Sequence, residues 1–369
     1  MSAVLIACGG TGGHLAPGIS IAEELQDRGH SAILLVSRKQ VDSALIRKYD
    51  HLQFYRAPGR AFSGGLTSRL LALLDVLSGL FFSIKLIRKH QPVSVLLFGG
   101  FLSLGLGLAA RIHGVPVVVH EANCRPGRAV RILKSLASRI YLPEGVSLPV
   151  SPDRIRYYGY PVRREIKPCS KEIAREKLGM KTSGKLLVII GGSQGAEALN
   201  QWVQEEFKQL ASAGVSVYCV AGIGKVIEEE ILCPGPDGKK IRARFVAFTD
   251  QMAEVLSAAD IVISRAGAGA IAEMIRCRTP AILIPYPHAA DQHQLANAEL
   301  HEKQGGGIVL AEEEMDSLLE RTLRLIQDDS RLAEFEVVLE QLNETDVAGR
   351  MVDDILLVGG KQKMEVASS

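Results

Sequence analysis

No two of the six cysteines are spaced as C-x-x-C, and they are scattered between Cys8 and Cys277. Neither a zinc site nor a disulfide framework is therefore indicated, and a reducing compartment fits this cysteine usage best. The formal net charge is only +2, so the strong basic excess that is typical of nucleic-acid-binding domains is also missing. We expect no nucleic acid among the partners of this protein.

The sequence also lacks an apolar stretch long enough to span a bilayer. The longest such stretch, 70–84, contains Asp75 and is followed by Lys85, whereas a spanning helix needs about 20 apolar residues. The opening residues, MSAVLIACGG, carry none of the basic residues that begin a signal peptide. We therefore expect neither a membrane-spanning segment nor a secretion signal.

Two glycine-rich stretches lack the residues of the standard nucleotide-binding motifs. GGTGGH (9–14) has Leu15 where the dinucleotide fingerprint needs a third glycine, and neither it nor GGSQGA (191–196) continues as GK[ST]. The second apolar run is followed by Arg38 and Lys39 rather than by an acidic residue. Because a basic pair can hold an NADP phosphate, an NADP-dependent oxidoreductase stays an alternative. No DxD metal motif is present, and we expect neither a metal nor an organic cofactor.

What the sequence does contain is an alternation of short apolar runs with helical patterns. Runs such as 4–7 and 32–36, bounded by glycine, are typical of buried parallel strands. Between these two runs, Pro17 suits the first turn of a helix that ends at Gly29. The alternation predicts a doubly wound, mostly parallel α/β sheet. Further strands are expected at 93–98, 115–119, 215–220, 244–248, 261–264 and 281–284.

The pattern restarts near residue 185, where KLLVIIGGSQGAEALN again reads as strand, glycine turn and helix. We therefore expect two doubly wound domains that face a cleft, with the join in the proline- and charge-rich stretch 161–173. Ligands should bind beyond the carboxyl ends of the strands. The polar residues 358–369 are expected to form a frayed tail.

Both glycine loops have the composition of anion-binding sites. Bare glycine lets backbone N–H groups and a helix N-terminus approach a phosphate, and Ser193 and Gln194 add side-chain partners in the second loop. Alternatively, these glycines only tighten the turns between strand and helix. His14 stands beside the first loop, where an imidazole with a pKa near 6.5 can accept a proton at neutral pH. It could also merely cap a backbone carbonyl.

Seven motifs occur in one order along the chain, and together they resemble one family. They are GGTGGH (9–14), HEAN (120–123), PG (126–127), GYPVR (159–163), GGSQGAEALNQ (191–201), SRAGAGAIAE (264–273) and DQHQLANA (291–298). The chain resembles the MurG family, whose members move N-acetylglucosamine from UDP-GlcNAc onto lipid I in peptidoglycan synthesis. The resemblance implies the GT-B architecture, with Rossmann-like domains at 1–162 and 163–340. It also implies a last helix at about 341–357 that crosses back to the first domain.

The resemblance also implies roles for individual residues in an inverting transfer. His14 is the first candidate for the base that deprotonates the acceptor hydroxyl. Glu273 matches an acid that binds the ribose, and Arg163 matches an arginine that faces the donor diphosphate. Phe248 matches a residue that packs against the uracil, unless it is a core residue. The other matches on the donor side are Thr11, Gly12, Gly13, Asn123, Ser193, Gln194, Thr249, Ala268, Gly269, Ala270, His293 and Gln294.

Simpler interpretations of three of these residues stay open. Glu273 could be a solvated acid on a helix face, Arg163 a linker charge and Asn123 a turn former.

Several positions depart from the usual pattern of the family. Tyr160 replaces an asparagine before proline, and Ala270 lacks a hydroxyl that the family usually has. Phe101, Leu104, Ala122 and Val130 also depart from the pattern, and Phe101, Ala122, Val130 and Tyr160 are departures on the acceptor side. Another UDP-sugar transferase acting on a glycolipid therefore stays an alternative, as does a binding protein without activity.

The apolar stretch 70–84 gains a possible role from the resemblance. Its residues recur at helical spacing and basic residues follow, a combination that suits an anionic membrane surface, although a plain core helix has the same periodicity. The resemblance implies an undecaprenyl-linked acceptor and a peripheral position on the cytoplasmic face of the bacterial inner membrane. The residues of the expected membrane patch are Leu77, Leu80, Phe81, Phe82 and Lys85.

Overall fold

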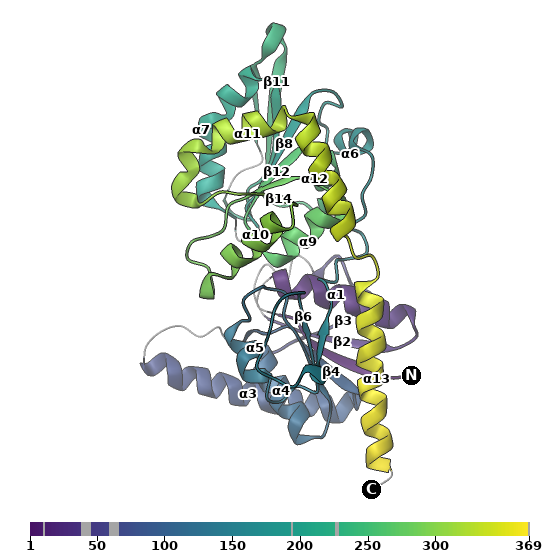
Figure 1. The fold of residues 1–369 in the computed structure, drawn as a ribbon. Coiled ribbons are helices and arrows are strands. Elements are labelled where there is room, and N and C mark those ends of the chain that lie inside the picture. The colour runs from purple at the N-terminus through teal and green to yellow at the C-terminus, as the bar shows by residue number, and fades with distance from the viewer. Residues whose placement is uncertain (10–11, 38–45, 59–65, 193–194, 226–228, 368–369) are drawn as a thin grey trace. The chain divides into compact units, whose positions relative to one another are not determined.

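The computed structural model describes residues 1–9, 12–37, 46–58, 66–192, 195–225 and 229–367. The chain divides into two compact units. The first unit comprises Met1–Arg163 together with Asp346–Ser369, and the second comprises Arg164–Thr345 (Figure 1). The second unit is thus continuous in sequence, whereas the first is completed by the last segment of the chain.

The first unit is built on a parallel sheet with the order β3-β2-β1-β4-β5-β6-β7. From β1 the chain proceeds outward to β2, and from β4 it proceeds in the opposite direction to β5. The strand order therefore reverses between β1 and β4, which is where doubly wound sheets bind ligands. The strands are β1 (Ala3–Ala7), β2 (Ser31–Val36), β3 (Gln53–Arg56), β4 (Ser94–Leu97), β5 (Val117–His120), β6 (Arg139–Leu142) and β7 (Ile155–Tyr157).

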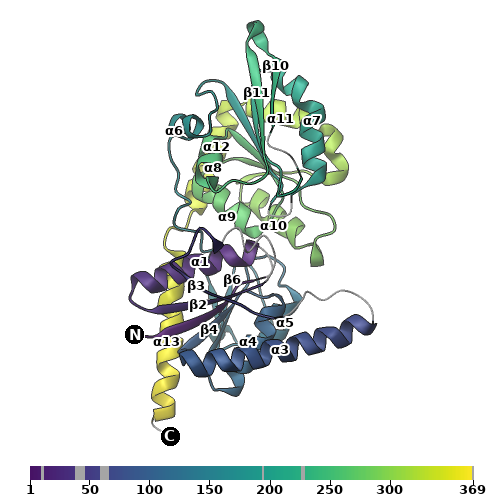
Figure 2. The ribbon, with the colours of Figure 1, turned by 180° about the vertical axis from the view of Figure 1, so that it is seen from behind.

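Helices cover both faces of this sheet (Figures 1 and 2). Strand β2 sends Leu34 and Val36 into the core under α1 and α13, and Ile33 and Leu35 into the core under α3, α4 and α5. Because both faces of the strand are buried, its sequence is continuously apolar instead of alternating. The helices are α1 (Gly12–Asp27), α3 (Leu66–His90), α4 (Gly100–Ile112), α5 (Arg128–Leu133) and α13 (Val347–Ala367), with the 3₁₀ turn η1 (Pro152–Arg154).

The second unit repeats this plan with the strand order β10-β11-β9-β8-β12-β13-β14. Here the order reverses between β8 and β12, and β10 is the one antiparallel strand among the described residues. The strands are β8 (Lys185–Ile190), β9 (Val215–Val220), β10 (Glu229–Pro234), β11 (Lys240–Val246), β12 (Ile261–Ser264), β13 (Ala281–Leu283) and β14 (Gly307–Val309).

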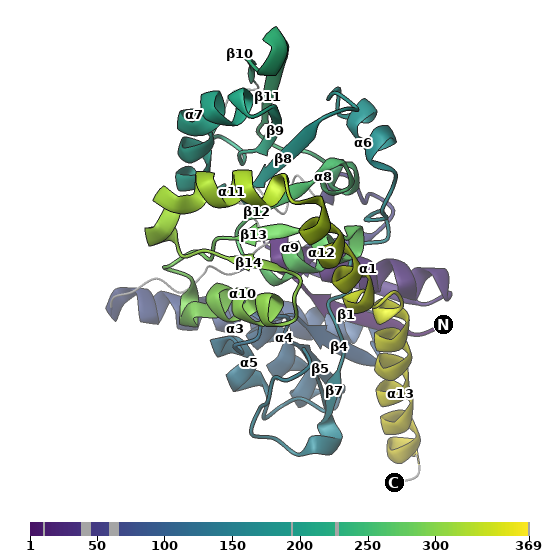
Figure 3. The same cartoon turned by 45° about the horizontal axis from the view of Figure 1, so that its top comes forward.

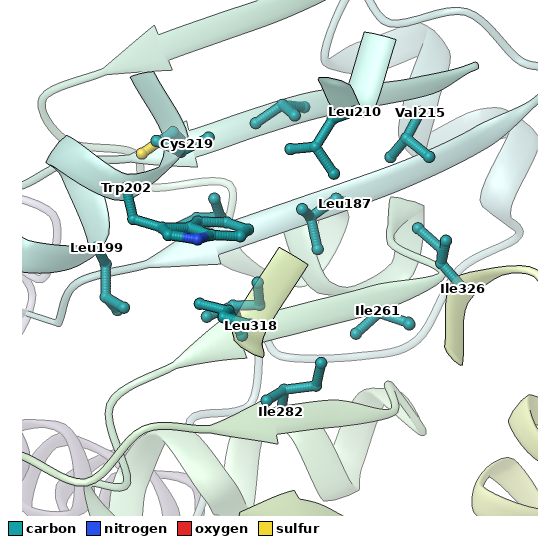
Figure 4. Close-up of a cluster of buried hydrophobic side chains, with 14 of the residues drawn as sticks. Leu187, Leu199, Trp202, Leu210, Val215, Cys219, Ile261, Ile282, Leu318 and Ile326 are labelled. Atoms are coloured by element: carbon teal, nitrogen blue, oxygen red, sulfur yellow. The ribbon is translucent and has the colours of Figure 1, made fainter. Parts of the chain in front are cut away.

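Helices α7 and α11 pack on the same face of this second sheet (Figure 3). Trp202 and Leu210 of α7 and Leu318 of α11 bury their side chains with Leu187 and Val215 of the strands (Figure 4). Full burial of an apolar side chain of this size contributes about 1.5–3 kcal/mol relative to exposure. The helices are α6 (Lys171–Lys177), α7 (Glu197–Ser212), α8 (Met252–Ala258), α9 (Ala268–Cys277), α10 (His293–Lys303), α11 (Leu318–Ile326) and α12 (Asp329–Leu342), with 3₁₀ turns η2 (Pro236–Gly238), η3 (Ala290–Gln292) and η4 (Glu312–Ser317).

The predicted fold class, two doubly wound α/β units, is confirmed. The strands expected from apolar runs coincide with β1, β2, β4, β5, β8, β9, β12 and β13 to within two residues. The sequence pattern did not predict strands β3, β6, β7, β10 and β14, because they are short or carry polar and exposed residues. The strand expected at 244–248 ends at Val246 instead.

Two expectations about helices are wrong. Helix α1 begins at Gly12, so Pro17 lies in its second turn rather than its first. The last helix, expected at about 341–357, runs over Val347–Ala367, so the tail expected to fray is helical up to Ala367. The pair Gly359–Gly360 does not end this helix, because Gly359 is where α13 lies against the chain entering β4. A Cβ at Gly359 would come within 2.8 Å of the Val93 carbonyl oxygen.

This close approach predicts opposite effects of alanine at two adjacent glycines. Gly359→Ala should destabilise the protein by about 1–3 kcal/mol, because the new methyl group overpacks the contact with Val93. Gly360→Ala should stabilise it by up to about 1 kcal/mol, because nothing lies within 4 Å of a Cβ there and alanine favours helix. Thermal unfolding of both variants measures the difference, and equal shifts of the two midpoints would contradict the packing described here.

Candidate active site

The loops after β1 and β4 meet where the strand order of the first sheet reverses, and His14 lies between them. His14 belongs to the first turn of α1. Its ring lies against the backbone at the start of α4: a Cβ at Gly100 would be 3.7 Å from His14 Nδ1, and one at Gly99 would be 3.9 Å from Cε1. No side chain caps this end of α4. The His14 imidazole thus lies next to the N-terminus of the 13-residue helix α4.

Glu121 organises the turn that follows β5. One carboxylate oxygen accepts hydrogen bonds from the backbone N–H and the side-chain amide of Asn123, both at 2.9 Å, and the other accepts the Gly127 N–H at 2.7 Å. Asn123 is therefore held in a fixed orientation at the carboxyl edge of the sheet. Sequence reasoning left Glu121 out of the site, although it lies in the HEAN motif that was recognised.

His120, the last residue of β5, is buried beneath this edge. Its ring contacts Phe98 and Tyr160, with centroids at 5.1 and 6.5 Å. Burial lowers the pKa of His120 to about 3; a hydrogen bond to the backbone of Gly159 opposes this shift, and the neighbouring His14 adds to it. His120 is therefore neutral at physiological pH.

The segment GYPVR (159–163) runs alongside α1. The Tyr160 hydroxyl donates to the Gly13 carbonyl at 3.1 Å, and the Ser20 hydroxyl donates to the Val162 carbonyl at 3.0 Å. Arg163, the last residue of this part of the first unit, lies with Nη1 3.5 Å from the Tyr49 hydroxyl.

In the second unit, the loop after β8 requires its glycines for close packing. A Cβ at Gly191 would lie 2.4 Å from the Ala196 nitrogen, and one at Gly195 would lie 2.5 Å from the Ala221 carbonyl oxygen. Gly195 also has a φ of +72°, which disfavours other residues. Three residues expected in the two glycine loops lie outside the described residues: Thr11, Ser193 and Gln194.

Strand β12 leads into α9, whose first turn contains Ala268, Gly269 and Ala270. This helix begins beside the loop after β8, because β8 and β12 are neighbours. Glu273 follows in the second turn and is partly exposed. The expected donor-site residues of this motif thus lie together at the carboxyl edge of the second sheet.

Arg265 connects the ends of two strands and was not among the predicted site residues. Its guanidinium donates to the Ile284 carbonyl at 3.2 Å, forms an ion pair with Glu312 and lies 5.4 Å from the centre of the Tyr286 ring. The SRAGA motif contained this arginine, and its apolar surroundings in sequence could have signalled a buried cation that needs a partner.

The loop after β13 leads into α10, whose first two residues are the expected donor-side residues His293 and Gln294. The Gln294 side chain accepts the Tyr286 N–H at 3.0 Å, and His293 Nδ1 lies 2.6 Å from the Ala290 carbonyl oxygen. Asp291 and Gln292 have φ angles of 54° and 53°, the left-handed region that few non-glycine residues adopt. This tight turn leads directly into the first turn of α10.

Phe248 follows the end of β11 and is 48% exposed, so its interpretation as a core residue is wrong. The adjacent Thr249 hydroxyl accepts the Gln251 N–H at 3.0 Å and closes the turn into α8. An exposed aromatic ring held by such a turn is available to a planar ligand. Within the residues that the structure describes, no group of three or more His, Cys, Asp or Glu side chains is arranged to hold a metal ion.

The expected membrane patch lies on α3 and separates into two sets. Leu77, Phe81 and Lys85 are exposed, and Phe81 is 64% exposed against 40% for Leu77. Leu80 and Phe82 pack against the core of the first unit instead. The spacing of four residues explains the division, because positions i, i+4 and i+8 share one helix face.

Comparisons with known proteins identify the family of this chain. The N-terminal domain model of glycosyltransferase family 28 matches residues 4–142, and the C-terminal domain model matches residues 186–348. A relative from Opitutus terrae is 49% identical, with 96% of this chain and 94% of the relative covered. It is named UDP-N-acetylglucosamine–N-acetylmuramyl-(pentapeptide) pyrophosphoryl-undecaprenol N-acetylglucosamine transferase. A relative of the same name from Parasynechococcus marenigrum is 32% identical, with 96% of this chain and 98% of the relative covered.

Among solved structures, the crystal structure of Acinetobacter baumannii MurG matches with a TM-score of 0.73 and 24% identity, covering 96% of this chain and 99% of that one. The two doubly wound units, together with the two matching domain models, define a glycosyltransferase of the GT-B architecture. The chain belongs to glycosyltransferase family 28. Because the chain belongs to this family, the alternative of an NADP-dependent oxidoreductase is set aside.

The buried His120 predicts a specific acid sensitivity. Its pKa is lowered in the folded state, so the unfolded state binds more protons as pH falls from about 6.5 toward 3. The stability that neutral His120 contributes is therefore present above pH 6.5 and is lost on acidification through this range. The difference in thermal midpoint between the wild type and His120→Gln should shrink from pH 7.5 to pH 5. A constant difference across that range would contradict the assignment.

Proposed function

We propose that this protein transfers N-acetylglucosamine from UDP-GlcNAc to the muramoyl sugar of lipid I and so forms lipid II. The observation that carries the proposal is the 49% identity to a transferase of that name over nearly the whole chain. The positions of the two glycine loops support it, since each lies at the point of strand reversal where doubly wound sheets bind phosphate-bearing ligands.

The second unit binds the donor in this proposal. The N-terminus of α9 and the loop after β8, with Ser193 and Gln194, accommodate the diphosphate, whose charge the helix N-terminus favours. Glu273 accepts hydrogen bonds from the ribose hydroxyls, both of which are donors. The exposed Phe248 packs against the uracil beside Thr249, and His293 and Gln294 contact the sugar.

The first unit supplies the base. The acceptor hydroxyl oxygen attacks the anomeric carbon from the face opposite UDP, and the bond from that carbon to the diphosphate oxygen breaks. His14 takes the hydroxyl proton, and UDP leaves with the electron pair of the broken bond. Gly12, Gly13 and Asn123 form the wall beside this base. Charge builds on the diphosphate in the transition state, so Arg163 and fixed N–H donors act there.

Two substitutions separate donor binding from chemistry. Glu273→Ala should weaken UDP-GlcNAc binding, because the ribose loses its acceptor. His14→Ala should leave UDP-GlcNAc binding intact and lower kcat by roughly 10²–10⁴-fold, because the proton of the acceptor hydroxyl has no base. Calorimetric titration and steady-state kinetics with lipid I measure the two effects.

The two variants control for each other, since each should spare the property that the other loses. A His14→Ala loss confined to KM would remove the role of base. Binding of UDP-GlcNAc without any transfer to lipid I, but with transfer to another glycolipid, would change the assigned acceptor and retain the donor site.

A peripheral position on the cytoplasmic face of the inner membrane is part of the same proposal. Among the residues that the structure describes, none of the helices has both the length and the apolar character that crossing a bilayer requires. Leu77 and Phe81 instead expose apolar surface on α3, followed by Lys85, Arg88 and Lys89. Apolar side chains beside basic ones bind anionic lipid surfaces.

Replacement of the exposed pair tests this surface. Leu77→Asp/Phe81→Asp should reduce flotation with vesicles that contain anionic lipid by at least about tenfold, because burial of the two side chains is lost and negative charge is added. The matched control is Val337→Asp, which changes a 56% exposed apolar residue of α12 in the second unit. Equal flotation of the folded double variant and the wild type would exclude α3 as the docking helix.

A further inference from the structure

Pro17 leaves a backbone carbonyl in the first turn of α1 without its usual partner. In an α-helix the N–H of residue 17 would donate to the carbonyl of residue 13, but proline has no N–H. Pro17 lies inside α1, not at its start. The Gly13 carbonyl, adjacent to His14 in sequence, therefore cannot receive the helical hydrogen bond from this position.

Tyr160 supplies the donor that proline cannot. Its hydroxyl lies 3.1 Å from the Gly13 carbonyl oxygen. The Tyr160 ring is fixed in turn by an edge-on contact with the buried His120, at 69° between the ring planes. The residue therefore joins the turn that carries His14 to the rigid end of β5.

A second hydrogen bond attaches the same segment to α1 without Tyr160. The Val162 carbonyl accepts the Ser20 hydroxyl at 3.0 Å, so the segment 159–163 is already attached to the third turn of α1. The Tyr160 bond adds an attachment one residue from His14, on the side of the helix where the carbonyl lacks its N–H. The Ser20 hydrogen bond is enough to hold α1 to this segment, whereas the Tyr160 hydrogen bond is needed to fix the start of the helix.

We propose that Tyr160 is a positioning residue for His14, acting through the Gly13 carbonyl that Pro17 leaves open. The inference rests on the proposed function only in taking His14 as the base. Tyr160 touches no reacting atom. Its hydroxyl fixes the backbone of the first turn and, with it, the direction in which the imidazole faces the acceptor hydroxyl.

Tyr160→Phe removes the hydroxyl and retains the ring that contacts His120. We expect kcat to fall roughly 3- to 10-fold, the effect of one neutral hydrogen bond, with KM for UDP-GlcNAc unchanged. Tyr157→Phe is the matched control, because Tyr157 ends β7 just before this segment and is 53% exposed. It should leave both parameters unchanged.

Pro17→Ala provides the rescue. Alanine restores an N–H that can donate to the Gly13 carbonyl, so the double variant Tyr160→Phe/Pro17→Ala should regain most of the lost kcat. Pro17→Ala alone should have near wild-type activity. An unchanged kcat in Tyr160→Phe, or a loss that Pro17→Ala does not rescue, would overturn the proposal.

A readout without turnover separates this inference from the proposed function. The NMR signals of the His14 imidazole, assigned by comparison with His14→Ala, should shift in Tyr160→Phe, return in the double variant and stay in place in Tyr157→Phe. Unmoved signals in Tyr160→Phe would overturn the positioning role. Full activity of His14→Ala would instead overturn the proposed base, and the imidazole signals would still report whether Tyr160 positions that side chain.

Discussion

Reversal of strand order within each parallel sheet is the constraint on which the rest of this structure depends. Neighbouring strands β1 and β4, like β8 and β12, send their following helices in opposite directions, so the space above their carboxyl ends stays open. Backbone from two loops must then approach closely in that space. At Gly191 and Gly195 the loop after β8 lies close to its own backbone and to the Ala221 carbonyl after β9, so a side chain at either position would collide with backbone.

The apolar runs made the fold predictable because a strand buried on both faces needs continuous apolar sequence. Strands β1, β2, β8 and β9 satisfy that condition and were located within a residue or so. Strands β7 and β10 lie at sheet edges, where one face or both reach solvent, and they carry arginine and glutamate instead. Their positions are set by backbone hydrogen bonds to a neighbouring strand, and such pairing cannot be predicted from the local sequence.

The candidate site was only partly predictable for a related reason. Motifs identified the residues that we propose as ligand contacts, such as His14, Glu273 and Gln294. They did not identify Glu121, which accepts N–H groups of the turn that it begins, or Arg265, which contacts the Ile284 carbonyl and the Glu312 carboxylate. Which carbonyl or N–H lies opposite a side chain is known only from the folded chain. Tyr160 is a further example, because its hydrogen bond to Gly13, beside Pro17, cannot be predicted from its departure from the family pattern.

The division of the chain into two units also affects the order in which they can fold during synthesis. Helix α13 contributes Val347, Met351 and Ile355 to the core that lies under α1, and these residues leave the ribosome after the whole of the second unit. The second unit, continuous from Arg164 to Thr345, can complete its core while the first still exposes the apolar surface that α13 will cover. The N-terminal unit is thus the last to be finished, which reverses the usual order of folding during translation.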